Sequence, residues 1–121
     1  MSLLESGENY LETILILSKT QSEIHAIDIV NQLGFSKPSV SIMLKKLKET
    51  GYITIDSSSH IHLTESGLFI ANKIYERHTC LTQFLEKIGV EPNVAEDDAC
   101  KIEHDLSDQT FQAIKKLIER L

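Results

Sequence analysis

Apolar residues recur at helical spacing in three stretches near the start of the chain, over residues 7–19, 26–33 and 36–51. The second stretch is followed by a glycine, which commonly ends a helix. Ser36 is suited to cap the start of the third, and Pro38 is tolerated only in a first turn, where its missing N–H costs nothing. The pattern predicts two short helices joined by a tight turn, preceded by one longer helix.

After Gly51 the period of the pattern changes from 3.6 to 2. Residues 52–56 and 60–64 alternate between apolar and polar side chains, and three serines separate them. This is typical of two short strands joined by a turn. Three helices followed by a hairpin is the element order of a winged helix-turn-helix, so residues 1–63 are predicted to form a DNA-binding domain of that fold.

The pattern of apolar residues in the second half of the chain predicts further helices and no strands. They cover about residues 64–88, 94–104 and a segment capped by Ser107, with Pro92 in the connection before the second of them. These helices are too few to close a core on themselves and on the winged domain. Residues 64–121 are therefore predicted to form a helical dimerisation domain of a symmetric homodimer. The expected fold is mainly α.

Composition narrows the class of protein. The chain has 121 residues, a mass of 13.7 kDa and a formal net charge of -6. It has no apolar run near the roughly 20 residues that cross a bilayer, and no catalytic motif, so neither a membrane protein nor an enzyme is expected. Its two cysteines are too few for a disulfide framework and are expected to be reduced thiols in the cytoplasm.

The charge distribution indicates DNA binding despite the acidic total. Four lysines and no acidic residue lie within 37–48, on the predicted third helix. Lysines attract phosphates regardless of sequence, and short side chains let a helix approach base edges. Ile42 is expected either to contact a thymine methyl group or to pack internally. The candidate DNA-binding residues are Ser36, Lys37, Pro38, Ser39, Ser41, Lys45 and Lys46.

A second group of residues indicates metal binding. Cys100, Glu103 and His104 have the spacing that places side chains on one face of a helix, and Glu96 lies one turn earlier. A thiolate, a carboxylate and an imidazole form a ligand set for transition metals, and His78 on the preceding helix could add a nitrogen. The alternative interpretation is an ordinary solvated face, because most acidic residues on helices lie at the surface.

Five short motifs occur in order along the chain: Gly7-Glu-Asn-Tyr-Leu-Glu12, Gly34-Phe-Ser-Lys-Pro-Ser-Val-Ser41, Leu63-Thr-Glu-Ser-Gly67, Arg77-His78 and Ala99-Cys-Lys-Ile-Glu-His104. The chain thereby resembles the diphtheria toxin repressor and manganese transport regulator family of metal-activated repressors. The resemblance implies a double-stranded DNA operator, a homodimer and control of metal-uptake genes. It also implies that the chain stops before the small barrel domain with which many members end.

The resemblance also implies a set of metal ligands. Asn9 stands where relatives have Asp or Met, and Glu96 stands where one branch of the family has histidine. One metal ion per subunit is expected, with a modified second site as the alternative. Fe²⁺ or Mn²⁺ is the expected corepressor, and Zn²⁺, Co²⁺ or Ni²⁺ are expected to substitute in vitro. The ion is expected to join the first helix to the dimerisation domain. The implied ligands are Glu12, His78, Cys100, Glu103 and His104, with Asn9 and Glu96 as further candidates.

Two alternatives to this function remain at the level of sequence. The chain could be a winged-helix regulator that needs no metal, in which case its acidic face is only surface. It could also be a winged-helix adaptor that binds protein rather than DNA.

Overall fold

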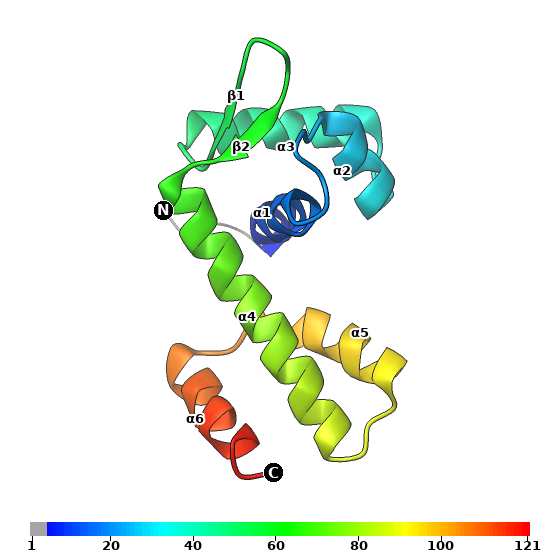
Figure 1. Ribbon diagram of the computed structural model, residues 1–121, viewed down its shortest axis with the longest axis vertical. Helices are drawn as coiled ribbons and strands as arrows, with labels where there is room; N and C mark the ends of the chain where they lie inside the picture. The colour runs from blue at the N-terminus through cyan, green and yellow to red at the C-terminus, as the bar shows by residue number, and fades with distance from the viewer. Residues whose placement is uncertain (1–4) are drawn as a thin grey trace. The chain divides into compact units, whose positions relative to one another are not determined.

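The computed structural model describes residues 5–121, so the first four residues of the predicted DNA-binding domain lie outside the described part. Within this range the chain forms six helices and one two-stranded antiparallel sheet (Figure 1). The contacts divide the chain into two compact units, which meet in sequence between Asn72 and Lys73, and each is described here by itself. None of the helices in residues 5–121 is long and apolar enough to cross a membrane.

The first unit is a winged helix-turn-helix, as the sequence predicts. Its core is built from apolar residues of the helices and the hairpin, including Leu11, Ile14, Ile29, Leu47 and Ile53. Its elements in chain order are α1 (Glu5–Ser18), α2 (Ala26–Leu33), α3 (Lys37–Glu49), β1 (Ile53–Ile55), β2 (Ile61–Leu63) and the start of α4 (Glu65–Lys87).

Local chemistry fixes where α3 begins. The backbone at Gly34 is left-handed, with a φ of 72°, and its N–H caps α2 by donating to Val30 O over 2.8 Å. Two residues later, the Ser36 hydroxyl accepts the backbone N–H of Ser39 over 3.3 Å, as an N-cap residue does. The turn between α2 and α3 is therefore short and rigid, and it sets the position of α3 against the rest of this unit.

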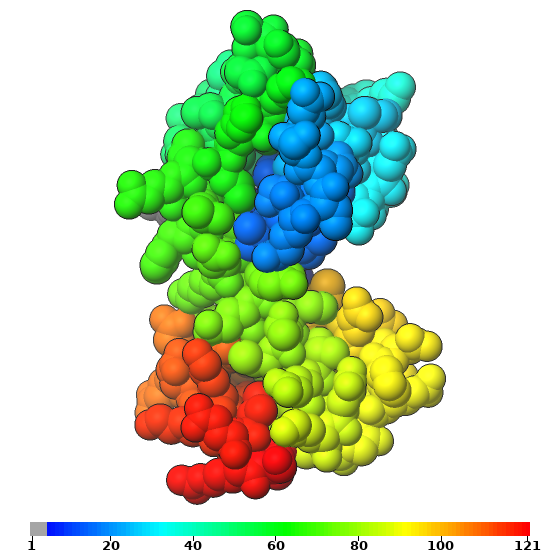
Figure 2. Space-filling model, viewed as in Figure 1, coloured from blue at the N-terminus to red at the C-terminus, as the bar shows by residue number. Residues whose placement is uncertain are grey.

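The hairpin packs against α3 and is held at its tip by one carboxylate. Ile53 pairs with Leu63 and Ile55 with Ile61 in antiparallel register. Asp56 Oδ1 accepts the backbone N–H groups of Ser58 and His60 over 2.9 and 3.0 Å. These bonds close the loop between the strands, which projects from the first unit (Figures 1 and 2).

The glycine that follows the hairpin is required by close packing. A Cβ at Gly67 would lie 2.0 Å from the carbonyl oxygen of Tyr52, which leaves no room for any other residue at this position. Gly67 belongs to the first turn of α4, so this approach lets the helix start directly beneath the hairpin.

The second unit contains the rest of α4 together with α5 (Pro92–Ile102) and α6 (Asp108–Ile118). The last two helices lie on different sides of α4 (Figures 1 and 2). Its buried apolar residues are Ile74, Leu81, Ala95, Ala99 and Phe111.

The predicted bounds of the helix over 94–104 were wrong at both ends. Pro92, expected in the connection, is the first residue of α5, because a proline at that position loses no hydrogen bond. At the other end, α5 stops at Ile102. Glu103 is its C-cap and His104 lies in the following turn. Two predicted metal ligands therefore lie just beyond the helix rather than on it.

Candidate metal centre and DNA-binding surface

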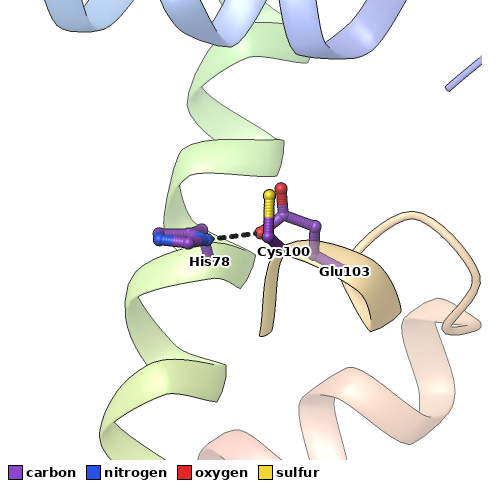
Figure 3. Close-up of side chains that lie close together, drawn as sticks. All are labelled: His78, Cys100 and Glu103. Atoms are coloured by element: carbon purple, nitrogen blue, oxygen red, sulfur yellow. Dashed lines mark hydrogen bonds and ion pairs between the residues drawn. The ribbon is translucent and has the colours of Figure 1, made fainter. Parts of the chain in front are cut away.

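Three of the predicted ligands converge in the second unit. His78 of α4, Cys100 of α5 and Glu103 at the end of α5 each offer one ligand atom, and these atoms lie within 4.8 Å of one another. Figure 3 shows the thiol and the carboxylate side by side, with the imidazole of His78 meeting the carboxylate from α4. The structure thus brings together residues that are more than twenty positions apart in sequence.

The carboxylate of Glu103 is the centre of this group and is fully buried, at 0% exposure. Its Oε2 lies 2.8 Å from Nδ1 of His78, within hydrogen-bond distance. Its Oε1 lies 3.4 Å from Nε2 of His104, yet makes no hydrogen bond in the described residues. Burying a carboxylate is costly unless both of its oxygens accept hydrogen bonds or contact a cation. Oε1 of Glu103 therefore still lacks a hydrogen-bond donor in the described residues.

The residues present fit a divalent transition metal. Imidazole nitrogen, thiolate sulfur and carboxylate oxygen are all ligand types that such ions accept. The buried Oε1 of Glu103 offers a site for a cation, and the Cys100 side chain is exposed, which leaves the group open to solvent. The imidazole of His104 is 2% exposed and faces the same carboxylate. The chemistry of this donor set therefore matches the sequence prediction.

The remaining predicted ligands lie elsewhere. Glu96 is exposed on α5, outside the converging group, and lines a depression of about 330 Å³ that also includes His78 and Glu86. Glu12 is buried and Asn9 is half-buried on α1, in the first unit. Their participation in metal binding stays a prediction.

All of the predicted DNA-binding residues are exposed in the first unit. They lie on α3 or at its N-cap, and Ser36 also donates its hydroxyl to the Ser39 Oγ over 2.9 Å. Ile42, for which either packing or base contact was expected, is 61% exposed and so does not pack into the core. A large apolar side chain on the outer face of α3 is available to a thymine methyl group.

The surface beside α3 is hollowed. A depression of about 580 Å³ lies among the start of α2, the middle of α3 and the hairpin. Lys45 and Lys48 contribute two cations to it, and His25 and Ser59 add polar groups around an apolar floor. Lys48 is one of the four lysines noted in the sequence within 37–48, and its spacing of three from Lys45 places both on one helical face.

The role of one further residue was missed at the level of sequence. Arg77 belongs to the Arg77-His78 motif, but no function was predicted for it. The structure buries this residue to 4% exposure and directs its guanidinium toward the turn that carries Glu103. Its partners lie 26 to 31 positions away, so no local pattern in the sequence indicates them.

Two family models match almost the whole chain. Residues 2–61 match the N-terminal DNA-binding domain of the iron-dependent repressors, and residues 64–121 match their metal-binding and dimerisation domain. The chain belongs to the iron-dependent repressor family. The resemblance inferred from the motifs is therefore confirmed, and the chain is a member of a family of metal-dependent, DNA-binding transcriptional repressors that bind metal ions and dimerise.

Individual relatives agree with this assignment. An HTH-type transcriptional regulator of Methanocaldococcus jannaschii is 34% identical over 96% of this chain and 94% of its own length. The transcriptional regulator MntR of Escherichia coli is 33% identical over 93% of this chain and 73% of its own. A solved manganese-dependent transcriptional repressor in complex with manganese is 26% identical, with a TM-score of 0.84 over 93% of this chain. The present chain covers 52% of that solved chain, about half its length.

Proposed function

We propose that this chain is a cytoplasmic homodimeric repressor for which Fe²⁺ or Mn²⁺ is the corepressor, and that it controls genes for metal uptake. Its role is regulatory, without catalysis. The observation that carries the metal part of the proposal is the buried carboxylate of Glu103: one oxygen lies on His78, and the other makes no hydrogen bond within residues 5–121. A buried anion that is only partly satisfied favours a cation beside it.

His78, Cys100, Glu103 and His104 would hold the ion, with Glu12, Asn9 and Glu96 as further proposed donors. When bound, the ion supplies positive charge that offsets the negative thiolate and carboxylate. Without that charge the carboxylates proposed as ligands repel one another, and this disfavours the arrangement that the site requires. Because the ligand set favours one conformation, metal binding shifts the population of the dimer toward the form that binds the operator.

The first unit would supply the DNA contacts. Lys37, Lys45 and Lys46 would contact phosphates, while Ser39 and Ile42 on the outer face of α3 would meet base edges in the major groove. The depression between α3 and the hairpin supports this assignment, because its cations would line the path of a sugar-phosphate backbone. In a symmetric dimer, the two copies of α3 would read half-sites about 34 Å apart.

The decisive experiment is a binding assay on duplex DNA taken from upstream of the protein's own transcription unit. Fluorescence anisotropy is measured with Fe²⁺ under anaerobic conditions, with Mn²⁺, and with chelator. We expect metal to raise operator affinity by about 5–150-fold, the usual range for coupling between two sites. Glu103→Gln should remove most of this increase. Asp97→Asn, which changes an exposed acid on α5 outside the proposed ligands, is the matched control and should retain it.

The two rival functions give different results in the same assay. Equal operator affinity in metal and in chelator identifies a regulator that does not respond to metal. Absence of any salt-dependent affinity for duplex DNA, with or without metal, identifies a protein-binding adaptor instead, because phosphate contacts always make binding depend on salt.

A further inference from the structure

A buried cation lies behind the candidate metal ligands. Arg77 immediately precedes His78 on α4 and is 4% exposed. Its Nη1 donates to the carbonyl oxygens of Glu103 and Leu106, over 3.1 and 2.7 Å, and its Nη2 donates to the Asp108 carboxylate. The guanidinium carbon lies 5.4 Å from the centre of the Phe111 ring. A buried guanidinium is costly, and these partners offset part of that cost, while Nε makes no hydrogen bond in the described residues.

The Glu103 carbonyl belongs to a helix end that needs a cap, whereas the Leu106 carbonyl lies in the connection to α6. The last carbonyls of a helix have no partner within the helix, and a left-handed glycine commonly closes the end. After α5 there is no glycine from Glu103 to Ser107, and no residue of that segment has a positive φ. Arg77 acts in place of such a cap from a different helix. Its positive charge also suits the negative end of the α5 dipole.

The turn that Arg77 caps is the one from which two of the proposed ligands project. Arg77 meets Glu103 at the backbone carbonyl, while the Glu103 carboxylate faces His78 and His104. The backbone carbonyl of Glu103 is therefore held by a hydrogen bond from Arg77, while the Glu103 carboxylate remains available to bind a metal ion. Two consecutive residues of α4 contact Glu103 in different ways: Arg77 binds its backbone carbonyl, and His78 contacts its carboxylate.

The same guanidinium ties α6 to this turn. Leu106 and Asp108 lie on either side of the Ser107 N-cap, so two of the Arg77 hydrogen bonds reach the start of α6. The contact with Asp108 also lowers the pKa of that carboxyl group, and Lys73 adds to the effect. Arg77 thus joins α4, the end of α5 and the start of α6 at one point.

We propose that Arg77 is a positioning residue of the metal site. It caps α5 from α4, holds Glu103 and His104 in the orientation that ligation requires, and fixes the start of α6 to the same turn, without contacting the ion. This inference rests on the proposed function, in which Glu103 and His104 are ligands. Residues behind metal ligands typically contribute 10–100-fold to metal affinity.

The test is a Co²⁺ titration of the full chain, because Co²⁺ gives absorption bands that report both affinity and ligand geometry. Arg77→Lys keeps the charge but lacks the planar fork, in which Nη1 donates to the two carbonyls while Nη2 donates to Asp108. We expect it to bind Co²⁺ about 10-fold more weakly, toward the lower end of the range for residues behind ligands, with shifted d–d bands. Arg77→Met, which keeps no donor, should approach 100-fold. Lys73→Met is the matched control, because Lys73 lies one turn earlier on α4 and also contacts Asp108.

Asp108→Asn separates the two halves of the Arg77 contact. It weakens the tie to α6 but leaves both carbonyl bonds, so Co²⁺ affinity and the d–d bands should stay close to those of the wild type. If Arg77→Met fails to fold, Arg77→Lys and Asp108→Asn still decide the question. Helix content from circular dichroism and apo-protein melting temperatures are measured for every variant.

Three results would overturn the inference or its basis. Wild-type Co²⁺ affinity and spectrum in Arg77→Lys, with weakened binding in Glu103→Gln, refutes the positioning role while the metal site stands. A lower melting temperature in Arg77→Lys, with unchanged affinity and bands, assigns Arg77 a purely structural role. Unchanged Co²⁺ binding in Glu103→Gln refutes the proposed site itself.

Discussion

The two units each contain a carboxylate paired with a histidine, and the two pairs differ mainly in burial. In the first unit Asp56 Oδ2 lies 3.0 Å from His62 Nε2, and the side chains are 40% and 54% exposed. In the second, Glu103 Oε2 lies 2.8 Å from His78 Nδ1, with side chains that are 0% and 22% exposed. The first pair is exposed, so water can satisfy the hydrogen bonds that its side chains leave unmade. The second pair is buried, so its remaining hydrogen-bonding capacity must be met by protein groups or by a bound ion.

The difference extends to how each unit does its work. The first unit presents its candidate DNA-binding residues on the surface, along one regular helix whose outer face carries serines and lysines. The second unit brings its candidate ligands together around a buried carboxylate, from α4, from α5 and from the turn after α5. Surface function of this kind tolerates exchange of single residues, while an interior site depends on the residues that hold its ligands in place.

The largest expected difference is in metal affinity, when the carboxylate of each pair is neutralised in turn. Glu103→Gln should weaken metal binding by at least about 10–100-fold, the scale found even for residues that only support a ligand. Asp56→Asn should leave metal binding unchanged, because water already satisfies that pair. Isothermal titration with Mn²⁺ and Co²⁺ measures both. Loss of affinity in Asp56→Asn would show that burial is not what distinguishes the two pairs.

The contrast between the units also explains what the sequence could predict. The winged helix-turn-helix follows from local signals: the change of period after Gly51, the Ser36 cap and the spacing of apolar residues. The prediction that the lysines of α3 contact DNA required only the observation that no acidic residue lies among them. For this unit, a pattern within about ten residues carries most of the information.

The convergence of candidate metal ligands could be predicted from the sequence, but the residue that supports them could not. Cys100 and Glu103 are three positions apart, and the αR conformation of the Glu103 C-cap keeps them on one face even though α5 has ended. The spacing argument therefore held although the helix bound was wrong. The partners of Arg77 could not be predicted, because the path of the chain between α4 and α6 decides which carbonyls it reaches.

The next effect concerns the outer face of α3. Replacing Lys45 and Lys46 together by Ala should weaken binding to all duplexes alike and flatten the dependence of affinity on salt by up to about 0.9 per lost phosphate contact. The same change at Lys115 and Lys116 of α6 is the matched control in the other unit and should leave the salt slope unaltered. Anisotropy titrations across a series of salt concentrations measure the slope.

Ser39 provides the complement to the lysine changes. Ser39→Ala should act mainly on the preference for operator over unrelated DNA, since its short side chain lies where base edges are read. If the lysine variants leave non-specific binding and its salt slope unchanged, α3 is not the helix that faces DNA.

A smaller, qualitative effect is expected from the identity of the ligand at Cys100. Thiolate favours softer ions such as Fe²⁺, Co²⁺, Ni²⁺ and Zn²⁺, whereas Mn²⁺ prefers oxygen donors. Cys100→Glu should therefore shift relative activation toward Mn²⁺, while Cys100→Ala should weaken activation by every metal. Operator binding at matched free Fe²⁺ and Mn²⁺, measured anaerobically, provides the ranking. An unchanged ranking in both variants would remove Cys100 from the ligand set and leave His78, Glu103 and His104.

The smallest effect concerns the exposed pair on the hairpin and its response to pH. The hydrogen bond from His62, with backbone N–H groups of His60 and Ser58, lowers the pKa of Asp56 from 3.8 to about 2. Because the folded pKa lies below the ordinary value, ionised Asp56 stabilises the hairpin fully above pH 3.8, and this contribution is lost as the pH falls toward 2.

Nuclear magnetic resonance on the full chain measures this titration directly. The Asp56 carboxyl carbon and the amides of Ser58 and His60 should titrate together near pH 2, because one carboxylate accepts both amide bonds. In Asp56→Asn the amide oxygen can still accept these N–H groups, so the hairpin should persist while its low-pH titration disappears. If the Asp56 carboxyl group instead titrates at 3.8, the hydrogen bond from His62 does not stabilise the ionised form. The contact between Asp56 and His62 would then contribute nothing to stability.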